Sequence, residues 1–287
     1  MTEMNFYLGC AVWSFKGWVG EFYPEKSRQG DFLSLYGDRL TAVEGNTTFY
    51  AVPDSATVAR WAAQTPPGFH FCPKMPKSVT HGDLLAPQLA GAIAFLERME
   101  GLGDRLGVTF IQLPPSYSPE AFGDLESFLS RLVEEEHKLA VEVRHLDWFQ
   151  ESYRDRLNEL LQSLKIGRVL LDTRPVYESS DDPQLHSRTR KPDVPLQPVI
   201  TSDFGFVRFI SHPQSQFNQQ FLQEWSQQID RWVKEGKTIY FFVHCPEEEH
   251  SPQTARDLQK LLEKQETSIP ELPWNRLKMP PKQLSLF

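Results

Sequence analysis

Short apolar runs recur along the chain, and each is separated from the next by a longer segment whose apolar residues follow a helical period. The runs have the length and the β-branched and aromatic content of buried strands. We place the strands at residues 7–12, 42–46, 69–73, 108–113, 140–144, 168–172, 206–210 and 239–244. Eight strands alternating with helices at near-even spacing predict an α/β fold, a single (β/α)8 TIM barrel, over residues 1–266.

Capping residues indicate where several of the intervening helices begin. We expect helix starts at Asp54 or Ser55, at Ser118-Pro119 and at Ser251-Pro252. One irregular stretch, residues 177–198, contains several prolines and interrupts the rhythm after the sixth strand. It is expected to form a long loop at the mouth of the barrel.

The end of the chain carries a motif of its own. Residues 267–287 are punctuated by prolines and show no helical or strand period, so we expect an extended tail. The tail ends in Gln283, Leu284, Ser285, Leu286 and Phe287. This peptide resembles the one by which bacterial replication and repair proteins dock onto the sliding clamp, with apolar side chains in pockets and the glutamine amide fixing the register. The sliding clamp is therefore a predicted partner; the alternative is that the apolar side chains fold back onto the protein.

The composition is that of a globular protein: 287 residues, 40% hydrophobic and 24% charged. The chain has neither a leader-like start nor an apolar run long enough for a membrane span, so we expect a cytoplasmic protein without membrane contact. Cys10, Cys72 and Cys245 lie in apolar runs without metal or redox spacing and are expected to be buried free thiols. The formal net charge of -8 argues against non-specific binding to nucleic acid, which needs a basic surface.

Polar and ionisable side chains gather where the predicted strands end. In chain order they are Glu44 and Asn46, Lys74, Gln112, Glu142 and Arg144, Asp172, Arg208, and His244. Residues two apart on a strand share a face, and TIM barrels place their chemistry at the carboxyl ends of the strands. We therefore expect these side chains to share one pocket. The alternative is a closed network of ion pairs among the same residues.

Five ordered motifs carry a resemblance to a known family. They are Trp13-Ser14-Phe15, Glu44-x-Asn46-x-Thr48-Phe49-Tyr50, Lys74-x-Pro76-x-x-x-Thr80-His81, Gln112-Leu113-Pro114-Pro115-Ser116 and Glu142-x-Arg144-His145-x-x-Trp148-Phe149. In this order they resemble the domain of unknown function 72 family, whose members are similar to TIM barrels. The resemblance spans roughly residues 7–262 and implies the barrel fold. It implies no reaction, because the family has no settled one.

The candidate catalytic residues are Glu44, Lys74, Glu142, Arg144 and Asp172. Neighbouring carboxylates in a desolvated mouth have their pKa values pushed apart, so Glu44 and Glu142 would act as a general acid and base pair. Lys74 and Arg144 would stabilise negative charge in the transition state. The alternative is that Arg144 is the permanent ion-pair partner of Glu142.

The candidate substrate-binding residues are Asn46, Gln112, Arg208, Ser211, His212 and His244. Three of them end or follow the seventh strand, where TIM barrels often hold a phosphate, so the predicted ligand is a phosphate-bearing small molecule or DNA. Carboxylates and histidines are ligands that a divalent metal takes, which leaves a metal open. Three interspersed cations argue against it, and we assign neither metal ligands nor a cofactor.

Three functions are compatible with these observations. The first is a hydrolase or lyase that acts on a phosphate-bearing substrate, such as damaged DNA or a damaged nucleotide, and is recruited to the sliding clamp. The second is a metabolic hydrolase or isomerase of a small sugar-like or phosphorylated compound. The third is a non-catalytic protein that binds the clamp.

Overall fold

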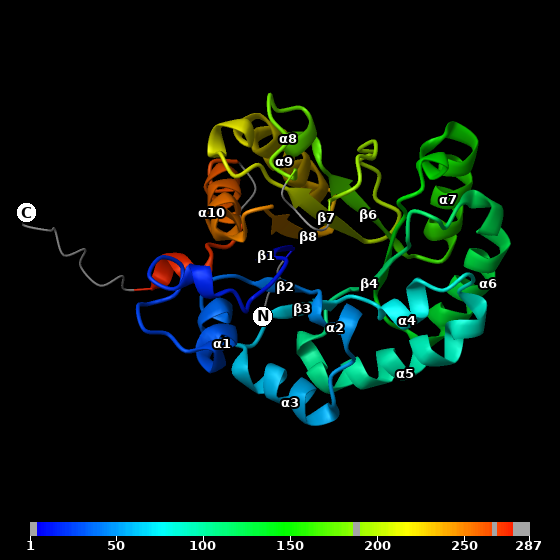
Figure 1. Cartoon of the computed structure of the whole chain (residues 1–287), viewed down its shortest axis with the longest axis horizontal. Helices are drawn as coiled ribbons and strands as arrows, with labels where there is room; N and C mark the ends of the chain where they lie inside the picture. Colours follow the sequence, from blue (N-terminus) through cyan, green and yellow to red (C-terminus); the bar gives the residue numbers. More distant parts are fainter. Residues whose placement is uncertain (1–4, 186–189, 266–268, 278–287) are drawn as a thin grey trace, which may run out of the picture.

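All eight predicted strands are present in the computed structural model, which describes residues 5–185, 190–265 and 269–277 (Figure 1). They are β1 (Phe6–Cys10), β2 (Ala42–Gly45), β3 (His70–Pro73), β4 (Thr109–Gln112), β5 (Leu139–Glu142), β6 (Gly167–Asp172), β7 (Phe204–Ile210) and β8 (Thr238–His244). The order β1-β8-β7-β6-β5-β4 makes a six-stranded sheet, and β2-β3 makes a two-stranded one. The strand pairs within both sheets are parallel. The chain therefore has an α/β fold built on a curled parallel sheet.

Helices lie on the outside of the strands (Figure 1). They are α1 (Phe32–Gly37), α2 (Thr47–Tyr50), α3 (Ser55–Gln64), α4 (Lys77–Thr80), α5 (Leu89–Met99), α6 (Phe122–Leu132), α7 (Glu151–Ser163), α8 (Arg174–Tyr177), α9 (Gln219–Lys234) and α10 (Ser251–Leu262). The predicted helix starts are confirmed, and Asp54 caps α3 by accepting a hydrogen bond from the Thr57 N–H at 2.7 Å. In the part of the chain that the structure describes, no helix is both long and apolar enough to cross a bilayer.

The strands are buried on both faces, because their side chains alternate between two apolar layers. One layer fills the inside of the curled sheet; this interior cluster consists of Tyr7, Ala42, Cys72, Val108, Phe110, Ala140, Val169, Phe204, Phe206, Tyr240 and Phe242. The residues between them, such as Leu8 and Val141, belong to the larger core shared with the helices. Burial on both faces explains why the strands read as continuous apolar runs. The three cysteines are buried and free, as predicted.

The predicted eight-stranded ladder is not continuous among the described residues. Between β3 and β4 the pairing is reduced to isolated bridges, such as the one between Lys74 and Phe110. Between β1 and β2 the backbones approach closely at Gly9, where a Cβ atom would lie 2.0 Å from the Ala42 carbonyl oxygen. Strand length is not the reason, because β4 and β5 also have four residues each and pair along their whole length.

The long irregular loop predicted after the sixth strand is present between α8 and β7. The Tyr177 hydroxyl donates to the Lys191 carbonyl oxygen at 2.5 Å, and the Lys191 N–H donates to Gln184 Oε1 at 2.7 Å. Farther along, His212 Nε2 lies 3.0 Å from Asp181 Oδ1. These contacts fix the position of Lys191 although no regular element surrounds it.

Residues 269–277 lie against the rest of the protein, so the predicted extended tail does not begin with them. Trp274 is buried, its ring meets Phe22 edge to face at a centroid distance of 4.9 Å, and the Arg256 guanidinium lies 4.5 Å from its ring centroid. Prolines separate the apolar residues here, so they pack without a period that a sequence pattern would reveal. The predicted clamp-binding peptide, residues 283–287, lies outside the described residues.

We predict that Trp274→Ala lowers the free energy of unfolding by about 3–5 kcal/mol, because it removes a buried aromatic side chain. Urea denaturation of the full chain measures the change. Leu146→Ala is the control, since Leu146 is 60% exposed and its loss is expected to change stability by less than about 0.5 kcal/mol. Equal effects of the two substitutions would contradict the packing of this segment.

Candidate functional site

Arg208, on β7, lies at the centre of a buried cluster near the carboxyl ends of the strands. Its Nε and Nη2 donate to the two carboxylate oxygens of Glu44 at 2.8 and 2.7 Å, and its Nη1 donates to Glu142 Oε2 at 2.5 Å. The two glutamates come from β2 and β5. All three side chains continue the faces that form the interior cluster, because residues two apart on a strand point the same way. One guanidinium thus binds two strands across the inside of the fold.

Gln112, at the end of β4, connects this centre to two further cations. Its Oε1 accepts hydrogen bonds from Lys74 Nζ at 2.8 Å and from Arg144 Nη2 at 2.6 Å, and Arg208 Nη1 lies 3.5 Å away. Arg144 Nε also donates to Glu142 Oε1 at 2.6 Å. One neutral amide oxygen therefore faces three cationic groups.

The two carboxylates of the cluster are held ionised. Burial alone would raise the pKa of Glu44, but Arg208 and His244 together hold that pKa well below its ordinary value. Burial likewise opposes ionisation of Glu142, and Arg208, Arg144 and Lys74 overcome it and lower the pKa of Glu142 to about 2. Both pKa values move down, so the expected acid and base pair, with pKa values pushed apart, does not form. The carboxylates instead act as fixed negative charges that orient Arg208.

Two lysines of the site have depressed pKa values. Burial, reinforced by Arg208, lowers the pKa of Lys74 to about 7, while Glu142 and Glu44 oppose the change. Burial and Arg208 also lower the pKa of Lys191, on the loop before β7, to about 8. Both lysines are therefore close to their titration points at neutral pH.

His244, on β8, links Glu44 to Lys191. Its Nε2 lies 2.9 Å from Glu44 Oε2, and its Nδ1 lies 3.4 Å from Lys191 Nζ. Burial lowers the pKa of His244 to about 4, so the ring is neutral, with Nε2 donating to Glu44 and Nδ1 accepting from the lysine. The Asn46 amide donates to Glu44 Oε1 at 2.7 Å and completes the shell around that carboxylate.

Two other predicted binding residues have different partners. The Ser211 hydroxyl donates to the carbonyl oxygen of His244 at 2.8 Å, so it holds β7 and β8 together. His212 Nδ1 accepts from the Gln214 N–H at 3.0 Å, and its Nε2 is close to Asp181 on the loop. Ser211 and His212 therefore have structural contacts beside the cluster, and the structure gives neither of them a contact with Arg208.

The structure does not bring Asp172 to the cluster. Arg174 binds both of its carboxylate oxygens at 2.9 Å, and the Trp225 indole N–H donates to it at 2.7 Å. In the strand register Leu171 pairs with Arg208, so Leu171 shares the inward face and Asp172 points out toward α9. The position of Asp172 at a strand end suggested a site residue, but the face of the strand decides otherwise.

Sequence reasoning missed two side chains of the site. Lys191 comes from the irregular loop, where no periodicity assigns a direction to a side chain. Phe49, on α2, places its ring 4.0 Å from Lys74 Nζ. A signal for Lys191 existed in its position within a long loop at the carboxyl ends of the strands.

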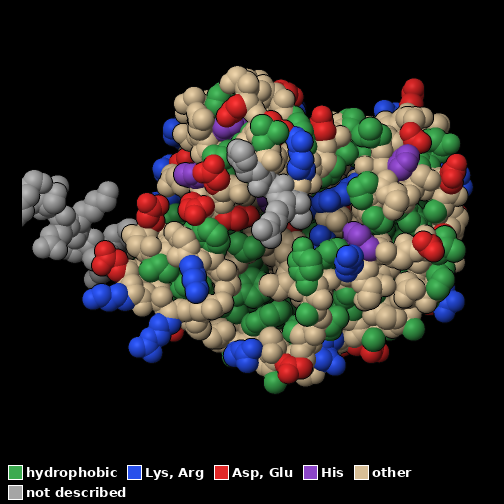
Figure 2. Space-filling view, viewed as in Figure 1, with side chains coloured by type: hydrophobic (Ala, Val, Ile, Leu, Met, Phe, Trp, Pro, Cys, Tyr) green, Lys and Arg blue, Asp and Glu red, His purple; other side chains and the backbone are tan. Residues whose placement is uncertain are grey.

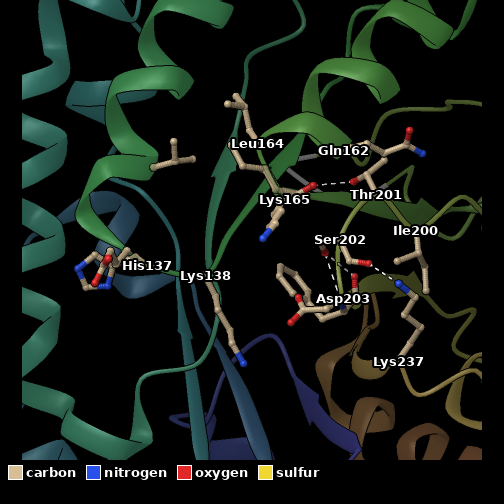
Figure 3. A pocket seen from close by; sticks show the side chains of 14 residues that line it. His137, Lys138, Gln162, Leu164, Lys165, Ile200, Thr201, Ser202, Asp203 and Lys237 are labelled. Atoms are coloured by element: carbon tan, nitrogen blue, oxygen red, sulfur yellow. Dashed lines mark hydrogen bonds between the residues drawn. The ribbon is translucent and has the colours of Figure 1, made fainter.

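A cavity of about 690 Å³ lies at the other end of the strands (Figure 3). Its lining residues immediately precede β5, β6, β7 and β8, and include Lys138, Lys165, Ser202 and Lys237. Lys237 Nζ donates to the Ser202 carbonyl oxygen at 2.8 Å, as Figure 3 shows. We do not assign the function to this cavity, because parallel α/β folds carry out their chemistry at the carboxyl ends of the strands.

The surface charges of the described residues on one face of the molecule give no sign of one large binding surface of a single sign. On the face seen in Figure 2, Lys and Arg side chains are interspersed with Asp and Glu side chains over the surface. Among the described residues, no group of three or more His, Cys, Asp or Glu side chains is arranged to hold a metal ion. Within the cluster Glu44 and Glu142 face the cationic side chains of Lys74, Arg144 and Arg208. Lys191 lies beside His244, and Glu248 acts on it electrostatically.

We predict that Glu142→Gln lowers the free energy of unfolding by about 3–5 kcal/mol, because Arg208 would keep its buried charge and lose one of its two carboxylates. Chemical denaturation measures the change. Glu134→Gln is the matched control, since both side chains of the Arg131–Glu134 pair are 65% exposed and such pairs contribute about 1 kcal/mol or less. If the two variants were equally stable, the network around Arg208 would not depend on Glu142.

Comparison with known proteins agrees with the family resemblance of the five motifs. The family described as "Protein of unknown function DUF72" matches residues 7–277. UPF0759 protein YecE of Escherichia coli is 33% identical over 285 residues, which cover 98% of this chain and 99% of that protein. Crystal structures of DUF72 family proteins from Enterococcus faecalis and Thermotoga maritima share the fold, with TM-scores of 0.68 and 0.66 at 18% and 22% identity. The match with the Enterococcus faecalis structure covers 92% of this chain and 100% of that chain, and the match with the Thermotoga maritima structure covers 90% and 99%. This chain belongs to the DUF72 family of proteins of unknown function.

Proposed function

We propose that this protein is an enzyme, a hydrolase or lyase, that acts on a phosphate-bearing substrate bound at the cluster around Arg208. The observation that carries the proposal is the position of Lys74, which is buried beside Gln112 with no carboxylate within ion-pairing distance among the described residues. A buried cation without a counterion is unfavourable. A bound anion would supply the missing charge.

The arginines explain why the negative charge has to come from a ligand. Glu44 and Glu142 are already engaged by Arg208, Arg144 and His244 through short hydrogen bonds. The side chain of Arg144 is 14% exposed, whereas those of Arg208, Glu44 and Glu142 are at most 1% exposed. Guanidinium groups bind phosphate in a bidentate manner, and the two lysines add positive charge beside it.

Lys74 also supplies a group that can transfer protons. A pKa of about 7 lets its amine gain or lose a proton near neutral pH, which suits general acid or base catalysis. Damaged DNA and damaged nucleotides are within the class of phosphate-bearing substrates, and so are small sugar phosphates. A metabolic hydrolase or isomerase and a purely binding protein are the competing functions.

We take the two sheets to form one closed (β/α)8 barrel. Backbone hydrogen bonds from Met75 N–H to Phe110 O at 2.9 Å and from Thr41 N–H to Leu8 O at 3.1 Å support this, because they cross the two places where regular pairing stops. In a closed barrel the inward side chains of neighbouring strands converge at one mouth. That geometry accounts for the meeting of residues from β2, β4, β5, β7 and β8 around Arg208.

We predict that sulfate, which has the shape of a phosphate group and keeps its charge near neutrality, binds the cluster and binds more weakly as the pH rises from about 7 to about 8. Lys74 and Lys191 lose their protons over this range, so the attraction for an anion falls. Isothermal titration calorimetry at a series of pH values measures the dissociation constant. Arg144→Gln should weaken binding by about tenfold or more, which corresponds to one charge-assisted hydrogen bond.

Lys165→Gln, on the opposite end of the strands, is the control and should bind sulfate as the unmodified chain does. Absence of sulfate binding to the intact chain would overturn the proposed function. Turnover assays with abasic and nicked DNA, nucleotides and sugar phosphates then distinguish the candidates. Turnover of a sugar phosphate alone would favour the metabolic enzyme, and binding without any turnover would favour the non-catalytic protein.

We also propose that residues 283–287 dock onto the bacterial sliding clamp. The Gln-Leu-Ser-Leu-Phe sequence of this peptide supports the proposal. We predict that the intact chain binds the clamp and that a chain ending at Lys282 does not, because Phe287 and the two leucines would supply the apolar contacts. Surface plasmon resonance with immobilised clamp measures both. Equal binding by the two chains, or none by either, would contradict clamp docking.

A further inference from the structure

We infer that Lys74 is the nucleophile of this site and that the substrate is an aldehyde or ketone bearing a phosphate, which Lys74 binds covalently as an imine. The inference rests on the proposed function and narrows it to carbonyl chemistry, and therefore to a lyase rather than a hydrolase. Four features carry it: the fixed backbone of Lys74, the surroundings of its amine, the missing counterion and the neighbouring guanidinium of Arg144.

The backbone of Lys74 is held from two sides. Its N–H donates to Thr48 Oγ1 at 3.1 Å, and the Thr48 hydroxyl donates to its carbonyl oxygen at 2.7 Å. Lys74 also forms an isolated parallel β-bridge with Phe110 on β4. A nucleophile has to be held close to the productive geometry, and a residue anchored between strands meets this condition better than one on a loop. Lys191 is on such a loop, so we assign the role to Lys74.

The amine of Lys74 has surroundings that favour its neutral form. Its Nζ donates to the uncharged Gln112 Oε1 at 2.8 Å and lies 4.0 Å from the Phe49 ring centroid and 5.9 Å from that of Phe110. An amide oxygen accepts a hydrogen bond but provides no counter-charge. A lysine in an ordinary ion pair stays protonated and cannot attack a carbonyl, whereas a desolvated lysine near other cations can.

The charged and titratable groups that act on Lys74 come from three strands, from Arg144 just after β5 and from His81 just after α4. Burial and Arg208, on β7, lower its pKa to about 7, while Glu142 and Glu44, on β5 and β2, oppose the change and Arg144 adds to it. About half of the Lys74 amines are therefore neutral at pH 7, compared with roughly one in a thousand for an ordinary lysine. The neutral amine is the form that adds to a carbonyl.

Arg144 is placed to hold the phosphate of the same molecule. Its Nη2 donates at 2.6 Å to the oxygen that Lys74 Nζ contacts at 2.8 Å, so the guanidinium and the amine are next to each other on Gln112. A phosphate bound by Arg144 would put a carbonyl a few bonds away within reach of Lys74. This spacing is found in small sugar phosphates and in the ring-opened sugar of an abasic site in DNA, which share an aldehyde near a phosphate.

The proposed step needs no reactant other than one proton from the solvent. The lone pair of the neutral Lys74 amine attacks the carbonyl carbon, a C–N bond forms, and the carbonyl oxygen takes up a proton to give a carbinolamine. The C–O bond then breaks, a second proton leaves with the oxygen as water, and the nitrogen, having lost one of its own protons, remains as a protonated imine. The balance is one amine, one aldehyde and one proton in, and one iminium and one water out.

Reductive trapping tests the inference. The full chain is incubated at neutral pH with sodium cyanoborohydride and 2-deoxyribose 5-phosphate, or with a DNA duplex containing an abasic site, and the product is analysed by intact mass and peptide mapping. Hydride transfer converts the imine into a stable secondary amine. We expect one adduct, on Lys74, formed roughly five-hundredfold faster than adducts on exposed lysines, as its larger neutral fraction implies. The two substrates distinguish a metabolite from DNA as the source of the aldehyde.

Matched variants separate covalent chemistry from loss of folding. Lys74→Arg keeps a cation but cannot form an imine at neutral pH, so it should bind sulfate and give no adduct. Lys74→Met should give no adduct either, and Lys260→Gln, a substitution of an exposed lysine on α10, should label like the unmodified chain. Deoxyribose without phosphate should label Lys74 more slowly, because Arg144 then has no anion to hold.

The outcomes distinguish this inference from the proposed function. If the intact chain binds sulfate but neither aldehyde labels Lys74, the inference is overturned and the phosphate-binding enzyme stands. If Lys74 labels no faster than exposed lysines such as Lys260, the amine is not activated and the inference is also overturned. If sulfate does not bind, the proposed function itself fails.

Discussion

The ion pairing of Arg208 with Glu44 and Glu142 is the interaction on which the rest of the site depends. It joins β7 to β2 and β5 across the inside of the fold, where neither the guanidinium nor a carboxylate could be buried alone without a large loss of stability. Once formed, it keeps both carboxylates ionised and removes them as partners for the lysines. This is why our proposals give the acid and base role to Lys74 instead of the glutamates and take the ligand to be an anion.

Much of the fold could be predicted, because it depends on patterns that repeat. The strands were recognisable as apolar runs since they are buried on both faces. The helix start at Asp54 follows from a capping hydrogen bond, and the starts near Pro119 and Pro252 follow from proline in the first turn. Closure of the sheets was not readable in the same way. It depends on how closely β2 and β3 approach β1 and β4 in space, and the apolar pattern of a single strand carries no information on that.

The site could be predicted where strand geometry determines the direction of a side chain, and not elsewhere. Glu44, Gln112, Glu142 and Arg208 meet because each continues an inward face, whereas Asp172 is displaced by one residue and points outward. Lys191 could not be placed because a loop has no period. The direction of the pKa shifts was also out of reach, since it depends on which cation each carboxylate meets in space.

The pairing of β1 with β8 has a consequence for the way this protein is made. Phe6 is in register with Ile239, so one edge of β1, the first strand, pairs with β8, the last strand of the described chain. During synthesis β1 therefore exposes an unpaired apolar edge for most of the time that elongation takes. The pairing of β1 with β8 can therefore form only once β8 has been synthesised.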